Sequence, residues 1–322
     1  MRFKKILVVC PANTVTGGPE ALHQLVNHMC SLGLSAAIVY YPFDKEFATP
    51  LAYQDYGVPV EKYADEEGNI IIFPEIYPYL ALKVKQAKAG LWWLSLDNFL
   101  EKRYLSPLRD GFRYFKKVLK GERPLRGAKD LKNLLHFSQT EHSTRYLVEC
   151  GITPIPLIDS INEGFLTDRY LDKTDHKQNR ILYNATKGKN ITEQLIAAYP
   201  DWEFVGLKGL NREQLSEKLY HSKIYMDFGH HPGRDRMPRE AAMHGCCLIT
   251  GVLGSAGNDV DLPIPSLYKL DSRDALFVEK FGDLAADIFK DFDKHYQGLD
   301  SYRKWLQNEP SVFKQQIADY FN

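Results

Sequence analysis

The stretch Ser222–Asn258, SKIYMDFGHHPGRDRMPREAAMHGCCLITGVLGSAGN, has the clearest structural pattern in the chain. Within it, Ile224–Asp227 and Cys246–Thr250 are short, mostly apolar runs that predict two strands. Between them, Pro238–His244 predicts a helix, because a proline in the first helical turn loses no hydrogen bond. A glycine-rich loop, Gly251–Gly257, follows the second strand. The order strand, helix, strand predicts a parallel βαβ unit.

The same alternation of strands and helices runs through the rest of the 322 residues. Further strands are predicted over Ile6–Cys10, Ala36–Tyr41, Asn69–Phe73, Leu91–Leu96, His136–Gln139, Ile155–Ile158, Arg180–Tyr183 and Trp202–Val205. Apolar residues at helical spacing predict helices over Glu20–Leu32, Thr192–Ala198 and Arg212–Tyr220, and more helices from Ala275 onward. Continuous apolar strands joined by helices are typical of parallel sheets buried on both faces. The sequence therefore predicts an α/β fold.

The polar and strongly charged stretch Thr167–Asn179 interrupts this pattern and predicts a linker. We expect a Rossmann-like N-terminal domain over residues 1–165 and a second Rossmann-like domain over residues 166–305. A C-terminal helix is expected over residues 306–322, with packing against the first domain as one possibility. Each domain is long enough to bury its own core.

The composition describes a globular protein without an obvious charged partner. Hydrophobic residues make up 44% of the chain and charged residues 25%, and the formal net charge is zero, which argues against a nucleic-acid partner. The first apolar run, Ile6–Cys10, is too short for a signal peptide or a membrane span, so we expect a cytoplasmic protein. Five cysteines without a C-x-x-C pair predict reduced thiols.

The stretch of residues 101–132 differs from the average composition, with eleven Lys or Arg residues against four acids. Apolar residues alternate with these basic residues at helical spacing. Such a basic amphipathic helix can lie on an anionic membrane surface, which would place the protein at the inner face of the membrane. The alternative is a helix that packs on its own domain and exposes a solvated basic face.

The loop before the Pro238–His244 helix has the composition of an anion site. Free N–H groups in the first turn of that helix, with Arg234 and Arg236 beside them, can bind phosphate. Glu240 follows in the first helical turns, where its carboxylate can accept hydrogen bonds from both hydroxyls of a ribose. The loop therefore predicts a nucleotide site.

Together, these residues resemble the GT-B glycosyltransferases, especially the large retaining group with the signature E-G-F-G-x-x-x-x-E-A-x-A-x-G-x-P-V-I. The run Glu240–Ile249, EAAMHGCCLI, is similar to its second half, whereas the position of the first family glutamate is Pro232 here. The resemblance implies a two-domain fold with a cleft, a nucleotide-sugar donor, with UDP- or GDP-sugars favoured, and Glu240 at the ribose. The His231-Pro232 pair is similar to a motif of CMP-sugar transferases, so a CMP-sugar stays open.

The resemblance also implies where the donor phosphates lie. In GT-B enzymes a basic residue in the loop that Lys187-Gly188-Lys189 occupies here neutralises the departing diphosphate, so Lys187 or Lys189, with Arg236, would act without metal or cofactor. Solvated lysines at a helix start are the alternative. The remaining positions assigned to the donor are Gly17, Gly18, Gly206, His231, Gly233, Arg234, Asp235, Gly254, Ser255 and Ala256.

Two carboxylates in the N-terminal half follow predicted strands. Glu75 comes after the strand ending at Phe73, and Asp97 comes after LWWLSL. Ligands gather at the carboxyl ends of strands in open α/β sheets, so either residue can position an acceptor hydroxyl or act as general base. The alternative for each is a loop carboxylate that caps a helix. His142 lies near another strand end and is a weaker candidate.

The function expected from these observations is metal-independent transfer of a hexosyl group from a nucleotide-sugar. The acceptor would be a glycan or a lipid-linked sugar in surface polysaccharide synthesis. A nucleotide-sugar epimerase of the same fold and a non-catalytic partner subunit are the alternatives. An NAD-dependent dehydrogenase is disfavoured, because the chain lacks the G-x-G-x-x-G fingerprint and AIVYYP ends without an acid.

Overall fold

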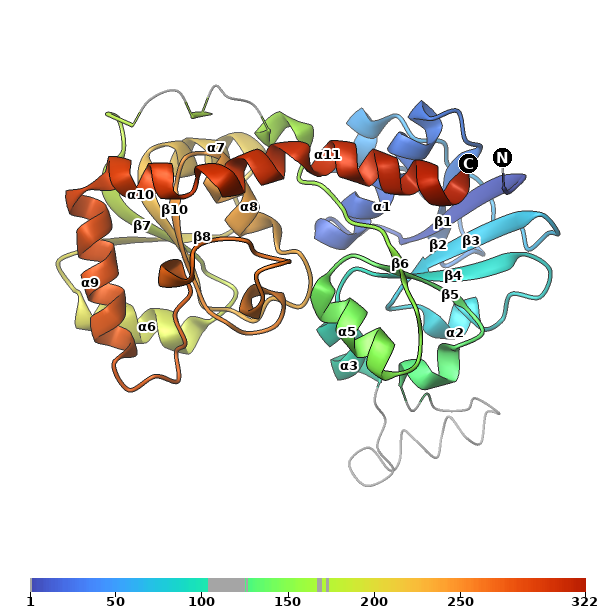
Figure 1. Cartoon of the computed structure of the whole chain (residues 1–322). Coiled ribbons are helices and arrows are strands. Elements are labelled where there is room, and N and C mark those ends of the chain that lie inside the picture. Colours follow the sequence, from blue (N-terminus) through green and yellow to red (C-terminus); the bar gives the residue numbers. More distant parts are fainter. Residues whose placement is uncertain (1, 104–124, 126, 167–169, 172–173) are drawn as a thin grey trace. The chain divides into compact units, whose positions relative to one another are not determined.

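The computed structural model describes residues 2–103, 125, 127–166, 170–171 and 174–322. The chain forms two compact units (Figure 1). The first unit comprises residues 1–159, 232–234 and 311–322, and the second comprises residues 160–231 and 235–310. Most of the predicted basic helix within residues 101–132 lies outside the described residues. Among the residues described, no helix combines the length and the apolar character needed to span a bilayer.

The first unit is built on a parallel sheet of six strands, in the order β2-β1-β3-β4-β5-β6. Its strands are β1 Lys5–Pro11, β2 Ala36–Tyr41, β3 Asn69–Pro74, β4 Lys88–Trp93, β5 Leu135–Ser138 and β6 Ile155–Pro156. Each pair of neighbouring strands is parallel, as the continuous apolar runs predicted.

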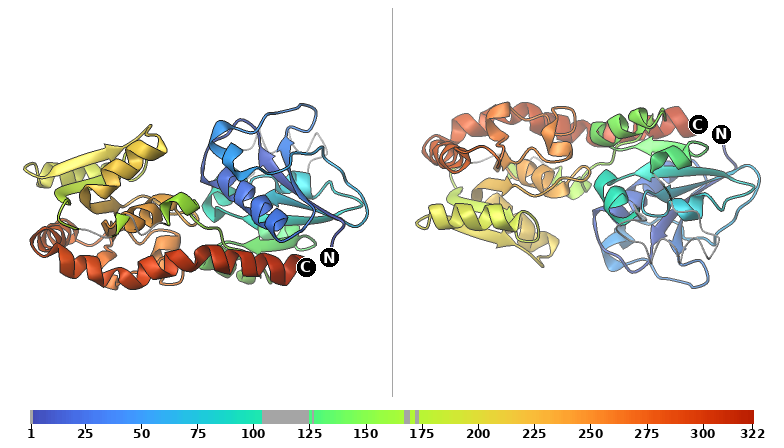
Figure 2. Two further views of the ribbon diagram at one scale, coloured as in Figure 1. Left: turned by 90° about the horizontal axis from the view of Figure 1, so that it is seen from above. Right: turned by 90° about the horizontal axis from the view of Figure 1, so that it is seen from below.

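Helices cover both faces of this sheet, because successive side chains of a strand point to opposite faces (Figures 1 and 2). Ile6 and Val8 pack with apolar residues of α1 (Gly17–Ser31) and of the end of α11 (Asp300–Phe321). Leu7 packs on the other face with residues of α2 (Pro78–Ala81), α3 (Leu96–Arg103) and α5 (Glu141–Glu149). The sheet is therefore buried on both sides.

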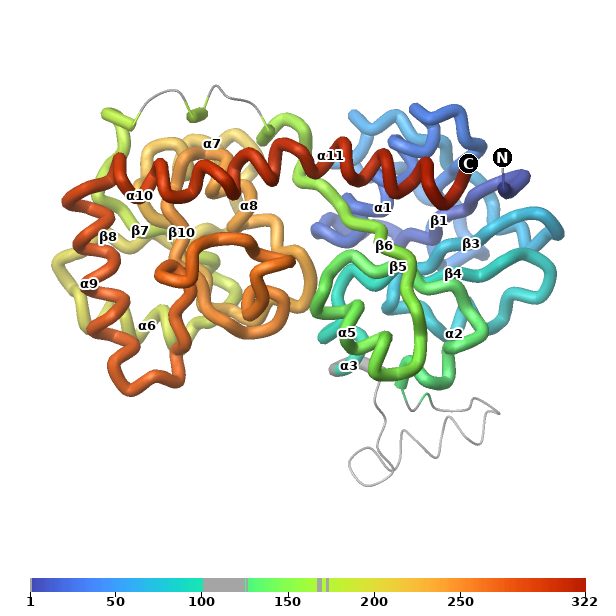
Figure 3. Tube along the Cα trace, viewed as in Figure 1, coloured from blue at the N-terminus to red at the C-terminus, as the bar shows by residue number. Residues whose placement is uncertain are grey.

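The second unit contains a parallel sheet of four strands, in the order β10-β9-β7-β8. Figure 3 follows the trace of this unit from green through yellow and orange to red. Its strands are β7 Gln178–Asn184, β8 Glu203–Leu207, β9 Ser222–Asp227 and β10 Cys247–Thr250. Its helices are α6 Lys189–Ala198, α7 Arg212–Tyr220, α8 Arg236–Met243, α9 Phe277–Lys290, α10 Phe292–Gly298 and the first part of α11. The prediction of an α/β fold with two parallel sheets is confirmed.

Short 3-10 helices complete the described part of the chain. They span η1 Leu51–Tyr56, η2 Ala128–Leu131, η3 Glu163–Phe165, η5 Ser255–Gly257 and η6 Ser266–Tyr268. All five cysteines are free thiols, as predicted.

Several predicted boundaries differ from the structure, and in four places a residue belongs to another kind of element than predicted. Gly17 and Gly18 lie in the first turn of α1 rather than in a loop, because the Glu20 N–H already donates to Thr16 O. Leu96 begins α3 instead of ending a strand, and Gly206 lies inside β8. Helix α8 begins at Arg236, two residues before the predicted start. The spacing of apolar residues did not predict these ends. The residues there are polar or small, or they fit both a strand pattern and a helix pattern.

A buried lysine joins two helix ends in the second unit. The Nζ atom of Lys177 donates to the carbonyl oxygens of Leu219, Ser222 and His244, at 3.0, 3.2 and 2.5 Å. Leu219 lies in the last turn of α7, and His244 is the C-cap of α8. Burial lowers the pKa of Lys177. The ammonium thereby satisfies carbonyls that a helix leaves without partners at its end.

Candidate functional site

Three loops meet at the carboxyl end of the second sheet. The loop after β7 lies against the turn after β9, since a Cβ atom at Gly188 would lie 2.9 Å from Gly229 N. The loop after β10 lies against the same turn, because Ser255 N donates to His231 O at 2.8 Å. Gly254 has a φ of 68°, and a Cβ atom there would lie 2.1 Å from His231 O. Ligands of open α/β sheets bind at this edge.

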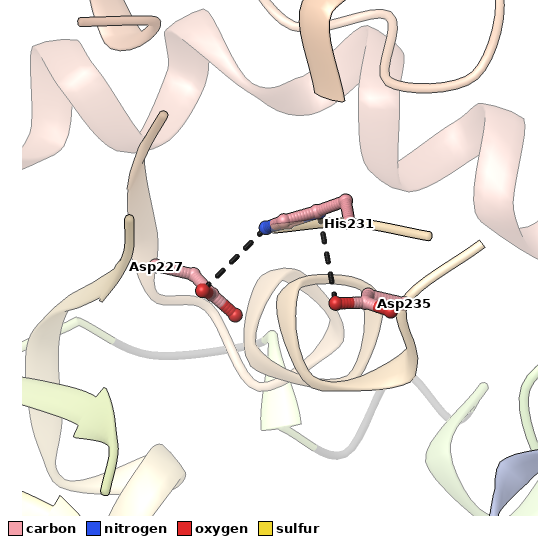
Figure 4. A group of neighbouring side chains, drawn as sticks. All are labelled: Asp227, His231 and Asp235. Carbon is pink, nitrogen blue, oxygen red and sulfur yellow. Dashed lines mark ion pairs between the residues drawn. The ribbon is translucent and has the colours of Figure 1, made fainter. Parts of the chain in front are cut away.

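Four charged side chains form a continuous row in these loops. Figure 4 shows three of them, Asp227, His231 and Asp235. The Nζ atom of Lys187 lies 2.6 Å from Asp235 Oδ2. The imidazole of His231 lies between two carboxylates, with Nδ1 3.9 Å from Asp235 Oδ2 and Nε2 3.5 Å from Asp227 Oδ1. Tyr225 donates its hydroxyl hydrogen to Asp227 Oδ2 at 3.1 Å. We refer to Lys187, Asp235, His231 and Asp227 as the charge row.

The charge row runs from the interior of the second unit toward solvent. The side chains of Asp227 and His231 are 2% and 4% exposed, whereas those of Asp235 and Lys187 are 16% and 33% exposed. Positive and negative groups alternate along it when His231 is protonated. Buried charges persist in a protein only when they are paired, so each member stabilises its neighbours.

The charge row changes the proton affinities of its two buried members. Burial alone would lower the pKa of His231, but Asp227 and Asp235 outweigh it and raise that pKa. Burial would likewise raise the pKa of Asp227, but His231, the Gly229 N–H and Lys187 outweigh it and lower that pKa. Both shifts favour the charged forms.

Asp227, His231 and Asp235 also form a group whose potential metal-ligand atoms lie within 4.8 Å of one another, among the residues that the structure describes. Two features favour an ion-pair network over a coordination sphere. The nearest carboxylate oxygens face different ring nitrogens of His231, and Lys187 already neutralises Asp235. A single cation can be bound by one imidazole nitrogen at a time.

The first turn of α8 begins beside the charge row. Asp235 is its N-cap residue, but its side chain makes no capping hydrogen bond. The positive end of the α8 dipole lies at this N-terminus and attracts anions. Arg236 Nη2 donates to Glu240 Oε1 at 2.8 Å, and the Glu240 side chain is only 4% exposed. The predicted ribose ligand is thus buried and paired in this structure.

The other residues predicted for the donor occupy different surroundings in the second unit. Lys189 is the first residue of α6, is 78% exposed and lies 3.5 Å from Glu193. Gly206 is exposed on β8, and a Cβ atom there would lie 3.0 Å from the Tyr183 hydroxyl. Ser255 and Ala256 are buried in η5. Lys187 therefore belongs to the charge row, and Lys189 belongs to the solvated surface.

In the first unit, the predicted carboxylates lie at the carboxyl ends of β3 and β4. Glu75 is buried, and its Oε2 accepts a hydrogen bond from Leu94 N at 3.2 Å. Asp97 lies in the first turn of α3, and its Oδ2 is 3.2 Å from His142 Nε2. Sequence reasoning named Asp97 and His142 separately and missed their contact.

Two further predicted residues group with the first unit. Arg234 N donates to Gln139 Oε1 at 3.2 Å, and Arg234 Nη1 lies 3.5 Å from Asp159 O. A Cβ atom at Gly233 would lie 2.0 Å from Leu94 O, so this position accepts only glycine without movement. Gly17 and Gly18 lie at the start of α1.

A pocket of about 380 Å³ lies beside the end of β2 in the first unit, and sequence reasoning did not find it. One wall includes Phe43 and Tyr63, whose rings stack with centroids 4.4 Å apart. Phe47, Glu46 and Lys62 also line it. Its aromatic and mixed-charge lining suits a neutral polar molecule with an apolar face.

Solved structures with the same fold include glycosyltransferases. A glycosyltransferase from Rickettsia africae ESF-5 is 14% identical, with a TM-score of 0.63 over 98% of both chains. Anabaena Alr3699/HepE, solved with UDP and separately with UDP-glucose, is 11% identical in the UDP complex, with a TM-score of 0.64 over 98% of both chains. Sucrose-phosphate synthase from Thermosynechococcus elongatus is 9% identical, with a TM-score of 0.63 over 99% of this chain and 98% of that one.

These likenesses show that the chain has a glycosyltransferase-like fold of the GT-B type. No model of a protein family matches the sequence, and no curated protein matches it.

Proposed function

We propose that the chain is a glycosyltransferase that moves a hexosyl group from a nucleotide-sugar to a glycan or lipid-linked acceptor. The observation that carries the proposal is the position of Lys187 and the α8 N-terminus, side by side at the carboxyl end of the second parallel sheet. An ammonium group and the positive end of a helix dipole at this edge suit a diphosphate. The nucleotide-sugar complexes of a protein with the same fold add support.

The chemical step needs positive charge at the departing phosphate. Lys187 and Arg236 supply it. Lys187 contacts the carboxylate of Asp235, the N-cap of α8, and Arg236 is the first residue of that helix. Fixed charge aimed at a leaving group accelerates transfer because it acts most strongly in the transition state. The same two residues make a divalent metal unnecessary, so we expect EDTA to leave the rate unchanged.

Glu240 is proposed to bind the ribose of the donor nucleotide. This role rests on the similarity of EAAMHGCCLI to the second half of the retaining-group signature. In the structure the Glu240 carboxylate is bonded to Arg236. A phosphate that attracts the Arg236 guanidinium would release the carboxylate for the ribose hydroxyls.

The acceptor is proposed to bind the first unit. Asp97 is the candidate general base, because its contact with His142 orients the carboxylate and gives the proton a path onward. Glu75 remains a second candidate for positioning the acceptor, although its buried carboxylate already bonds Leu94 N. The pocket lined by Phe43, Phe47 and Tyr63 suits a sugar ring of a glycan acceptor.

The expected place of action is the cytoplasm, with contact to the inner face of the membrane through residues 101–132. Eleven basic residues in that segment support this part of the proposal. Sedimentation with vesicles of phosphatidylglycerol and phosphatidylcholine tests it. Deletion of residues 104–124 should abolish binding to the anionic vesicles and leave nucleotide binding unchanged.

The decisive experiment is a thermal-shift panel with UDP, GDP, CMP, TDP and NAD. A ligand that binds only the folded protein raises its Tm, by an amount that grows with the ratio of ligand concentration to Kd. One nucleoside diphosphate, or CMP, should raise the Tm more than the others. No shift with any of these nucleotides would overturn the proposal. Conversion of the nucleotide-sugar without any acceptor would indicate an epimerase instead.

A further inference from the structure

The charge row contains two cations that share one carboxylate, and its response to a diphosphate rests on the function proposed above. Lys187 is the most exposed member of the row, and His231 lies behind it, separated by the Asp235 carboxylate. Asp235 Oδ2 lies within reach of both cations, at 2.6 Å from Lys187 Nζ and 3.9 Å from His231 Nδ1, while Asp227 Oδ1 is nearer to the ring, at 3.5 Å from Nε2. Asp235 therefore has two potential counter-ions, of which one is mobile and the other is fixed.

If Lys187 binds a phosphate closely, its present contact with Asp235 becomes weaker. Its flexible four-carbon side chain is one-third exposed, so it can turn toward a ligand. If it turns, Asp235 loses the partner that now lies 2.6 Å away. Loss of the partner of a partly buried carboxylate is costly unless another cation replaces it.

We propose that His231 is a positioning residue whose imidazolium replaces Lys187 as the counter-ion of Asp235 when a diphosphate binds. The imidazole is fixed for this role, because it is buried and its backbone is bonded to the loop after β10 through Leu253 O and Ser255 N. Asp227 Oδ1 lies 3.5 Å from Nε2, at the opposite edge of the ring. His231 thus acts on the donor through Asp235 and Lys187 rather than by direct contact.

The exchange links nucleotide binding to a proton. With Lys187 in place and His231 protonated, the two cations of the row balance its two carboxylates. When Lys187 leaves, a protonated His231 leaves one unbalanced negative charge, and a neutral His231 would leave two. The bound state therefore holds the His231 proton more tightly than the free state, and binding takes up protons.

The charged groups that face His231 are consistent with proton uptake on binding. Asp227 approaches it from β9, Asp235 from the N-cap of α8, and Lys187 from the loop after β7. Gly254 and Ser255, which pack against it from the loop after β10, carry no charge. Of these groups Lys187 alone opposes protonation, and it is the group that the ligand draws away.

The test is isothermal titration calorimetry of UDP in buffers of different ionisation enthalpy at pH 7.5–9, with inorganic pyrophosphate as a second probe for affinity alone. Above pH 7.5 a terminal phosphate with a pKa near 6 contributes little to the proton balance. The wild-type protein should take up a fraction of a proton per UDP near pH 8. His231→Gln should take up almost none, and the matched control His221→Gln, at the half-buried C-cap of α7, should behave as wild type.

A double-mutant cycle separates positioning from a general structural role. His231→Gln should weaken UDP binding about 5-fold or more, because Asp235 then keeps Lys187. Asp235→Asn removes the need for a counter-ion, so the double variant His231→Gln, Asp235→Asn should regain most of the lost affinity. A histidine that merely stabilises the loop would give no such rescue.

The outcomes separate this inference from the proposed function. Absence of UDP and pyrophosphate binding in the wild-type protein would overturn both. UDP binding with equal proton uptake in wild type and His231→Gln, or without rescue by Asp235→Asn, would overturn only the counter-ion exchange.

Discussion

The carboxyl ends of the two parallel sheets have the same topology but opposite chemistry. In the first unit, Glu75 and Asp97 follow β3 and β4, and their contacts are with Leu94 N and with His142. In the second unit, Lys187 and the uncapped start of α8 follow β7 and β9. One edge therefore offers carboxylates that can accept protons, and the other offers an ammonium group and a helix N-terminus beside paired carboxylates. The topology fixes where ligands gather, whereas the loop residues decide which ligand is bound.

Among these tests of the two edges, removal of the Lys187 side chain should give the largest loss of activity. Lys187→Ala is expected to lower kcat about 10²- to 10³-fold, because the departing diphosphate loses a preorganised charge. Lys189→Ala should have a much smaller effect, since Lys189 is 78% exposed and pairs with Glu193. Initial rates of UDP release at saturating donor measure both variants, with Lys208→Ala as a surface control. Similar losses in the Lys187 and Lys189 variants would contradict the assignment.

The carboxylate edge is tested by Asp97. Asp97→Asn should lower kcat about 10²-fold, which is the lower range for a lost general base, and leave the Kd for UDP unchanged. Nucleotide affinity by calorimetry and turnover with acceptor should be measured on the same preparation. Weaker UDP binding by the variant would show that Asp97 contributes to donor binding, and the two edges would then not have separate functions.

Glu240 gives a smaller effect and tests the ribose contact. Glu240→Ala should weaken UDP binding about 10-fold, corresponding to the loss of a hydrogen bond to a charged group. Glu240→Gln keeps the shape and should lose less. Glu213→Ala, in the exposed first turn of α7, is the control. The assigned role is lost if the Glu240→Ala protein keeps its fold by circular dichroism and binds UDP as wild type does.

The smallest expected effect is the pH dependence of stability in the second unit. The pKa of His231 is raised in the folded state, so its charge stabilises the fold fully below about pH 6.5. That stabilisation is lost as pH rises through the raised pKa. Between pH 6.5 and 9 the Tm of wild type should fall relative to His231→Gln by an amount on the order of 2 °C. A difference of opposite sign would show that His231 is neutral in the folded protein.

The fold could be predicted well because its signals are local. Continuous apolar runs such as Ile6–Cys10 and Ala36–Tyr41 reappear as β1 and β2 with little or no change in their ends. Arg212–Tyr220 is recovered with both ends unchanged, because Asn211 and Gln214 form a capping box. Prediction failed where a helix starts on residues without apolar spacing, as at Gly17 and Arg236.

The candidate site could be predicted only in part, because its contacts join distant residues. Sequence reasoning selected Lys187, His231 and Asp235 one by one, but the pair of Lys187 and Asp235 spans 48 positions. Asp227 was assigned only to the end of a strand, and nothing local shows that its carboxylate faces His231. The pocket beside β2 was missed for the same reason, since its walls come from residues 43–47 and 60–63.

The buried Lys177 has a practical consequence. Its ammonium is enclosed by the ends of α7 and α8, so an acylating reagent for amines should reach it only after the second unit opens. Exposed lysines such as Lys208 should react at once in the folded protein. The rate at which Lys177 is labelled, followed by peptide mass spectrometry, therefore reports the opening frequency of this unit. If an added nucleotide slows this labelling, binding at the N-terminus of α8 is detected by a lysine at its C-terminus.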